Sequence, residues 1–148
     1  MAVNLGPSGF GRSCRRQFHK HRRTFNHVYN HAHPLAANIR DDLVAAHESS
    51  FGKGAANDLV VGLQITHSGR YARPNAWDRP EPLVAFAHPV LDRRFPGGVR
   101  ILTDEDLDRL ADDYVRAAVL AQRAGFQFVD VKHCHGYLGH ELLAAHDR

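Results

Sequence analysis

The sequence predicts an α/β fold in which parallel strands alternate with helices. Two apolar runs of β-forming residues, 59–65 and 126–131, stand on either side of a strongly amphipathic segment that carries the start and stop signals of a helix. Two strands joined through a helix form a βαβ unit, whose strands run parallel. The runs do not alternate strictly between apolar and polar residues, as expected for strands covered on both faces.

Residues 1–37 indicate instead a basic arm that is rich in His and Arg. Seven of the 19 Lys and Arg residues lie in residues 1–40, which contain no Asp or Glu. Large apolar residues are scarce there and follow no helical or alternating period. We therefore predict that residues 1–37 are disordered or foreign to the domain behind them. Such an arm could alternatively bind nucleic acid or a metal ion, or act as an Arg-rich organelle address.

Ordered structure is expected from residue 38 onward. Apolar residues at helical spacing predict a helix over 38–49, and Gly52 and Gly54 end it. The strand over 59–65 follows. Residues 66–102 then form a long connection that contains five prolines, and connections of this length within a compact domain are usually functional.

The next helix has the clearest signals in the chain. Thr103 stands at the N-cap, and three acidic residues fill the first turn, where the helix dipole favours negative charge. Asp106 occupies the position where a capping box has Glu or Gln, so we expect an imperfect box. Gly125 ends the helix and the strand over 126–131 follows at once. A short last helix is expected after Gly136.

Composition argues against several classes of protein. The apolar runs are a handful of residues long, whereas a membrane span needs roughly 20. Residues 41–148 contain all 16 acidic side chains and fewer basic ones, so this part of the chain is mildly acidic and gives no reason to expect nucleic-acid binding there. The cysteines, Cys14 and Cys134, lie far apart in the sequence, so we do not expect a disulfide framework. This cysteine content fits a reducing compartment, and we expect a cytoplasmic location.

Polar residues directly follow both strands, where parallel α/β folds place their reactive groups. His67 is expected to be structural and Arg70 to form a salt bridge. After the second strand, His133, Cys134 and His135 form a cluster that could chelate a metal, but no second pair stands at zinc-site spacing, and we assign no metal ligand.

The residues around both strand ends follow a known pattern. Residues 62–70 read Gly-Leu-Gln-Ile-Thr-His-Ser-Gly-Arg, and residues 124–138 run from Ala-Gly-Phe to His-Gly-Tyr-Leu. These segments resemble the third- and fourth-strand motifs of the old yellow enzymes, the NADH:flavin oxidoreductase family of FMN-dependent ene-reductases. The resemblance covers about residues 38–148 and is specific, because both motifs occur in order with the right helix between them.

The resemblance implies a fold, a cofactor and a reaction. Residues 38–148 would be a fragment of a (β/α)₈ TIM barrel, roughly strands 3 and 4 with the neighbouring helices. The reaction would pass hydride from NAD(P)H through FMN to a small-molecule substrate, an α,β-unsaturated carbonyl or nitro compound. A whole barrel typically needs about 250 residues. We therefore expect this chain to be an incomplete, inactive fragment that associates through open sheet edges; the alternative is a non-catalytic remnant whose arm binds nucleic acid or metal.

The resemblance also assigns roles to four residues. Gln64 matches the family's flavin-binding Gln, which hydrogen-bonds the polar edge of the ring. His135 matches one of two side chains that hold the substrate's oxygen, and Lys132 stands where the family usually has the other, a His. Tyr137 matches the Tyr that protonates the substrate. A lysine in place of histidine offers a flexible point charge instead of a fixed ring N–H, which leaves substrate preference open.

Overall fold

The chain folds around a small parallel sheet. The computed structural model describes residues 2–4, 25–76 and 78–146. Its main sheet has the strand order β1-β2-β5, and a second sheet pairs β3 with β4. The strands are β1 (Ala2–Asn4), β2 (Gly62–Ile65), β3 (Leu83–Val84), β4 (Arg100–Ile101) and β5 (Phe128–Val131). Both sheets are parallel, which confirms the predicted α/β class.

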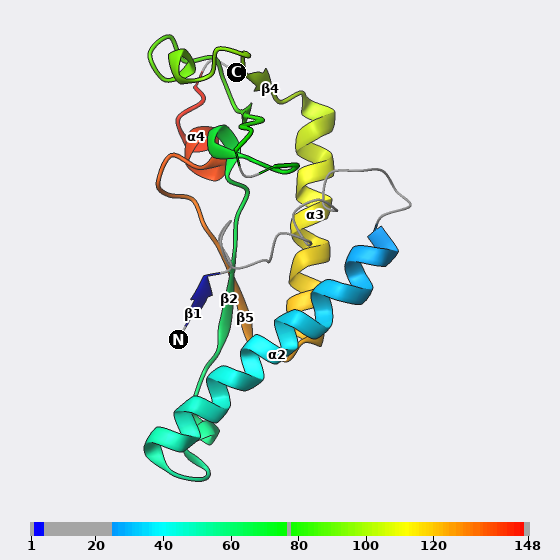
Figure 1. Ribbon diagram of the computed structural model, residues 1–148, viewed down its shortest axis with the longest axis vertical. Helices are drawn as coiled ribbons and strands as arrows, with labels where there is room; N and C mark the ends of the chain where they lie inside the picture. The colour runs from blue at the N-terminus through cyan, green and yellow to red at the C-terminus, as the bar shows by residue number, and fades with distance from the viewer. Residues whose placement is uncertain (1, 5–24, 77, 147–148) are drawn as a thin grey trace.

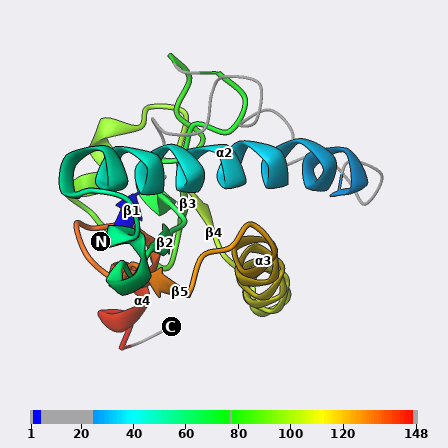
Figure 2. The same ribbon diagram turned by 90° about the horizontal axis from the view of Figure 1, so that it is seen from below.

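Two long helices cover one face of the main sheet. The helices of the described residues are α2 (Phe25–Phe51), α3 (Asp104–Arg123) and the short α4 (Leu138–Leu143). Figures 1 and 2 show α2 and α3 on the same side of the strip formed by β2 and β5, with α4 at the far end of that strip. The positions of α3 and α4 agree with the sequence prediction.

The apolar core lies between the sheet and these two helices. Leu63 of β2 and Val61, the residue just before β2, are buried together with Ala36 of α2 and Ala121 of α3. Val129 of β5 packs against this cluster. Because side chains of a strand alternate between its two faces, these odd-numbered strand residues point toward the helices.

The other face of the sheet, called the open face below, carries Gly62 and Gln64 of β2 with Phe128 and Asp130 of β5. The Phe128 ring lies over Gly62, where an added Cβ would come within 2.2 Å of it. Even so, 43% of Phe128 is exposed. The sequence indicated strands suited to cover on both faces and a chain too short to supply it; among the described residues Phe128 and Asp130 of β5 are exposed on the open face.

The N-terminus of α3 corrects the prediction about its capping box. Thr103 Oγ1 accepts a hydrogen bond from the Asp106 N–H at 3.2 Å, and Asp106 Oδ2 accepts one from the Thr103 N–H at 3.1 Å. The box is therefore complete, with Asp in place of the longer Glu. Arg100 and Arg109 also bind this carboxylate. Hydrogen bonds from Arg100 and from the Thr103 backbone hold the pKa of Asp106 well below its usual range.

Replacement of Asp106 tests this cap. Asp106→Asn keeps the shape but loses the charge, and we expect it to lower the free energy of unfolding by about 1 kcal/mol at pH 7. Because the pKa of Asp106 is depressed in the folded state, its contribution is complete above about pH 5 and falls at lower pH, where the unfolded chain takes up a proton that the folded protein does not. Urea unfolding at pH 7 and pH 3 should therefore show a smaller difference between the two proteins at pH 3. An equal difference at both pH values would contradict this account.

Helix α2 is longer than the sequence indicates. We predicted a helix over 38–49, but α2 begins at Phe25 and continues through Pro34. Proline lacks the N–H that an inner helical position donates, which is why Pro34 suggested a boundary. Helix α2 and β1 thus place regular backbone within residues 1–37; residues 5–24, which hold most of the basic arm, lie outside the described residues, and the disorder predicted for the arm stays a prediction.

The long connection from residue 66 to residue 102 is held by a buried ion network around Arg70. The guanidinium, 1% exposed, donates to Glu141 of α4 at 2.7 Å, pairs with Asp92 and donates to the Phe86 carbonyl oxygen. The second Glu141 oxygen accepts from the Ala85 N–H at 3.1 Å. Arg70 therefore forms the salt bridges that we predicted and joins the connection to α4.

No described helix is long and apolar enough to span a membrane.

Candidate functional site at the carboxyl ends of β2 and β5

Strands β2 and β5 place Gln64 beside Asp130 on the open face. The two residues are register partners, and Gln64 Nε2 donates to Asp130 Oδ2 at 2.6 Å. Gln64 is half-buried and Asp130 is exposed. The Gln64 amide and the Asp130 carboxylate therefore form a polar site that a ligand on the open face could contact.

Beyond the strand end, the side chain of Lys132 lies against the ring of Tyr137. The ammonium nitrogen is 4.3 Å from the ring centroid, within the range of a cation–π contact. The Lys132 N–H donates to the Ile65 carbonyl oxygen at 3.0 Å, which fixes the backbone beside β2. Tyr71, in the connection that follows β2, packs on Tyr137, and the centroids of the two rings are 6.1 Å apart. Two of the four predicted residues are thus in direct contact.

A tight turn reverses the chain between these two residues. The Tyr137 N–H donates to the Cys134 carbonyl oxygen at 3.3 Å, and the central residues His135 and Gly136 have φ values of 61° and 66°. Such left-handed conformations are uncommon for residues other than Gly, although His is among those that adopt them more often. The turn brings Tyr137 back over Lys132.

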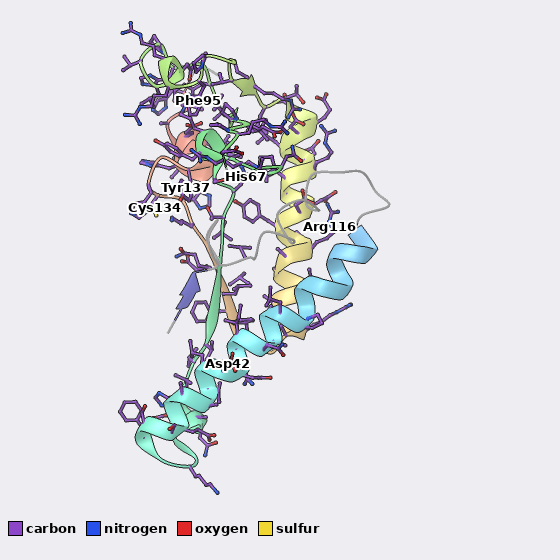
Figure 3. All side chains as sticks on the ribbon, viewed as in Figure 1. Asp42, His67, Phe95, Arg116, Cys134 and Tyr137 are labelled. Atoms are coloured by element: carbon purple, nitrogen blue, oxygen red, sulfur yellow. The ribbon has the colours of Figure 1, made fainter. Side chains whose placement is uncertain are left out.

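His135 does not join the Lys132–Tyr137 pair directly. Its side chain is exposed, and its Nδ1 lies 3.1 Å from Cys134 Sγ. Figure 3 shows Cys134 and Tyr137 at the same end of the strands as His67. The structure therefore places all four predicted residues at one end of β2 and β5: Lys132 and Tyr137 together, Gln64 on Asp130, and His135 on the turn.

Helix α4 is docked on the segment that follows β2. The Leu138 N–H donates to the His67 carbonyl oxygen at 3.2 Å, and Leu138 is 1% exposed. Gly69 has φ 56°, and a Cβ there would lie 2.8 Å from the Leu138 backbone nitrogen, so only glycine fits. The loops after the two strands therefore form one packed unit.

His67 has the structural contacts that the sequence suggested. Its Nδ1 accepts from the Gly69 N–H at 3.0 Å, and its own N–H donates to the hydroxyl oxygen of Tyr114 on α3, also at 3.0 Å. Burial raises the pKa of Tyr114, an effect that the hydrogen bond from His67 partly opposes.

Removal of the Tyr114 hydroxyl should destabilise the loop that contains His67. In Tyr114→Phe the His67 N–H, which is part-buried, loses its acceptor, and we expect a loss of about 1–2 kcal/mol in the free energy of unfolding. Chemical denaturation followed by circular dichroism measures this loss. Tyr71→Phe, at an exposed side chain, is the control and should stay within about 0.5 kcal/mol of wild type. Equal effects of the two substitutions would contradict the anchoring role of Tyr114.

A cavity of about 620 Å³ lies in the long connection beside this site. Its lining includes His67, Phe95, Arg94 and Arg100, together with several prolines. The four predicted site residues are not part of that lining. The cavity thus adjoins the end of β2, while Gln64, Lys132, His135 and Tyr137 belong to the open face and the turn. Within the described part of the chain, no group of three or more His, Cys, Asp and Glu side chains could hold a metal ion.

Sequence reasoning missed two residues of the site. Asp130 binds Gln64, but the sequence does not give the strand register that makes them neighbours. Its position two residues before Lys132, on the same face of a strand, was the available signal. Tyr71 packs on Tyr137 across 66 residues of sequence, and no local pattern indicates such a contact.

A comparison with protein families decides the relationship. The model of the NADH:flavin oxidoreductase / NADH oxidase family matches residues 29–146 of this chain. The chain belongs to this family. The match starts nine residues before the residue 38 that we predicted as the boundary, inside α2, so part of the predicted arm is family sequence.

Curated members of the NADH:flavin oxidoreductase family show the same relationship. A NADPH dehydrogenase from Listeria monocytogenes is 31% identical over 104 residues, which cover 70% of this chain and 29% of that protein. The NADH:flavin oxidoreductase FG08077 of Gibberella zeae is 28% identical over 57% of this chain and 24% of its own length. The chain thus spans less than a third of the length of either relative.

The residues at the strand ends fit the polar edge of a flavin ring. Gln64 offers both an amide donor and an acceptor. Thr66 Oγ1, two residues after Gln64, is buried and has no hydrogen-bond partner among the described residues, and a polar ring edge could provide one. The Lys132 ammonium lies just beyond, over Tyr137. Gln64, Thr66 and Lys132 are therefore the residues at this end of the sheet that could hold the ring of a flavin.

Proposed function

We propose that this chain supplies part of the active site of an FMN-dependent oxidoreductase that reduces activated alkenes with NAD(P)H. The contact between Lys132 and Tyr137, at the end of a strand whose neighbour presents Gln64, carries the proposal. The Lys132 ammonium, which can bind a substrate oxygen, lies beside the Tyr137 phenol, which can donate a proton. The Gln64 amide nearby is suited to the polar edge of a flavin ring. Family membership supports the same chemistry.

We further propose that the sheet is part of a (β/α)₈ barrel whose inner side is the open face. The parallel order of β2 and β5, with α3 between them in sequence and α2 and α3 on one side, is what two successive units of such a barrel require. Barrel enzymes carry their reactive groups at the carboxyl ends of the strands. Gln64, Lys132 and Tyr137 lie at that end.

Each side chain has a distinct task in this proposal. FMN, when bound, would supply hydride from its reduced ring to the β-carbon of the alkene. Gln64 would hydrogen-bond the polar ring edge and so fix its position. Lys132 and His135 would donate to the substrate's carbonyl or nitro oxygen, where negative charge builds during hydride transfer. The Tyr137 hydroxyl would then deliver a proton to the α-carbon and recover one from solvent.

A chimera tests this function. In the Listeria NADPH dehydrogenase, the 104-residue segment that matches this chain would be replaced by the chain's own residues. We expect the chimera to bind FMN and to reduce 2-cyclohexenone. Tyr137→Phe in the chimera should slow alkene reduction about a hundredfold while reduction of the flavin by NADPH changes little, since only the alkene step needs that proton.

Two further variants of the chimera sharpen the result. Lys132→His should retain or raise alkene reduction if the side chain at this position faces the flavin. Gln64→Ala should weaken FMN binding. Equal losses in both half-reactions for Tyr137→Phe would show that Tyr137 is structural, and a colourless chimera would contradict the proposed flavin site.

A further inference from the structure

We propose that Asp130 sets the orientation of the Gln64 amide, so that the carbonyl oxygen of Gln64 faces a ligand that carries an N–H donor. The inference rests on the proposed function, since it takes this donor to be the imide N3–H of the flavin ring. Asp130 is then a positioning residue, which acts on the ligand through Gln64.

The orientation follows from the chemistry of the pair. Gln64 Nε2 and Asp130 Oδ2 are 2.6 Å apart, a short distance for an N–H···O hydrogen bond to a carboxylate. A carboxylate at neutral pH can only accept hydrogen bonds, whereas an amide donates from its nitrogen and accepts at its oxygen. The reverse orientation would place Gln64 Oε1 against Asp130 Oδ2, two acceptors at contact distance. The nitrogen end of the amide must therefore face β5.

The orientation of Nε2 also fixes the positions of the Gln64 carbonyl oxygen and of the second Nε2 proton. With Nε2 turned toward Asp130, Oε1 lies on the side of the amide away from β5. Among the residues whose side chains the structure describes, no hydrogen bond reaches Oε1, and one N–H of Nε2 also remains. Gln64 would thus present an acceptor beside a donor, in a fixed order along the strand pair. An imide edge, with its C=O next to N–H, is the complementary pattern.

The strand register makes the pair a fixed part of the sheet. Gln64 and Asp130 are Cα partners in the parallel ladder, with Leu63–Val129 before them and Ile65–Val131 after them. Leu63 is 5% exposed and packs in the core, so β2 cannot slide or rotate without loss of that packing. The amide is held by a rigid backbone on one side and a carboxylate on the other.

The first experiment examines the protein without ligand. In ¹⁵N-labelled chain, we expect one Nε2 proton of Gln64 to resonate downfield and to exchange slowly with solvent, because it is bound to Asp130. Asp130→Asn removes the constraint, since an asparagine amide can both donate and accept, and the downfield Gln64 proton should return toward the chemical shift and exchange rate of a solvent-exposed glutamine. Asp130→Glu, which restores a carboxylate, should recover the wild-type pattern at least in part. Gln64 protons with the chemical shifts and exchange rates of a solvent-exposed glutamine in the wild type would overturn the proposed orientation.

The second experiment measures what the orientation does. The chain would be titrated by NMR with FMN and with 3-methyl-FMN, in which a methyl group replaces the imide hydrogen. For the wild type we expect the methylated flavin to bind about tenfold more weakly, because Gln64 Oε1 loses its donor. In Asp130→Asn the ratio should fall below about threefold, since the amide can turn. Gln64→Ala should abolish the preference.

The outcomes separate this inference from the proposed function. If Asp130 had only a general structural role, its replacement would weaken both flavins equally and leave the ratio unchanged, which would overturn the inference. Equal affinity of the wild type for both flavins would do the same, while the flavin site itself would stand. Absence of any spectral change with millimolar FMN would overturn the proposed flavin site and the inference with it.

Discussion

Replacement of Arg70 by methionine is expected to destabilise the protein by about 3–5 kcal/mol. Arg70 is 1% exposed and faces Glu141, 7% exposed, and Asp92. Without the guanidinium, two carboxylates remain close together with no cation between them, and removal of one partner from a buried ion pair costs this much. Since domains are stable by only about 5–15 kcal/mol, α4 and the connection should lose their structure under mild conditions.

Urea unfolding and hydrogen exchange measure this effect. Arg79→Met is the matched control, because Arg79 pairs with Glu81 at 2.9 Å but is 66% exposed. Exposed pairs contribute up to about 1 kcal/mol, so this variant should be close to wild type. The amides of Leu142 and Leu143 in α4 should exchange faster in Arg70→Met and remain protected in Arg79→Met. Similar stabilities for the two variants would show that the buried network does not hold α4.

Local signals in the sequence predicted the elements that depend on nearby residues. Thr103 and Gly125 lie at the two ends of α3, as caps that satisfy or end the backbone hydrogen bonds of that helix require. The motif ending at Arg70 indicated a salt bridge, which the structure confirms. The start of α2 was missed because Pro34 signals a break, although the helix continues through it.

Contacts between distant segments could not be predicted in the same way. Arg70 binds a carboxylate 71 residues later, and Gln64 binds one 66 residues later. Many acidic residues were possible partners, and only the strand register and the docking of α4 select Asp130 and Glu141. The short strands β3 and β4 were missed for a related reason, since two residues are too few to show a period.

The open face determines how the 148-residue chain should behave when expressed by itself. We expect that it does not retain FMN through gel filtration and that it associates with itself. The described contacts available to a flavin are Gln64, Thr66 and Lys132, all toward the ring. Docking costs a ligand on the order of 4–15 kcal/mol in lost freedom, which so few contacts offset only in part. Weak binding, detectable by NMR at millimolar FMN, is compatible with this expectation.

Self-association should involve the open face because apolar surface and strand edge coincide there. On the open face, Phe128 of β5 is 43% exposed, and β5 is the last strand in the order β1-β2-β5. An uncovered strand edge presents unpaired N–H and C=O groups to another chain, and exposed apolar side chains add to the attraction. Light scattering should therefore show dimers or larger species at micromolar concentration.

Two variants place the association on the sheet. Phe128→Lys puts a charge on the open face and should shift the protein toward monomer by at least about tenfold in dissociation constant, since a charged side chain opposes edge pairing. Val115→Lys is the control: Val115 is 64% exposed, but it lies on α3, away from β5. It adds the same charge and should leave the association nearly unchanged. Sedimentation velocity of both variants, with a visible spectrum of each, measures the outcome. A wild-type monomer that carries one FMN per chain would contradict both expectations, and equal dissociation of the two variants would show that charge in general, and not the open face, controls assembly.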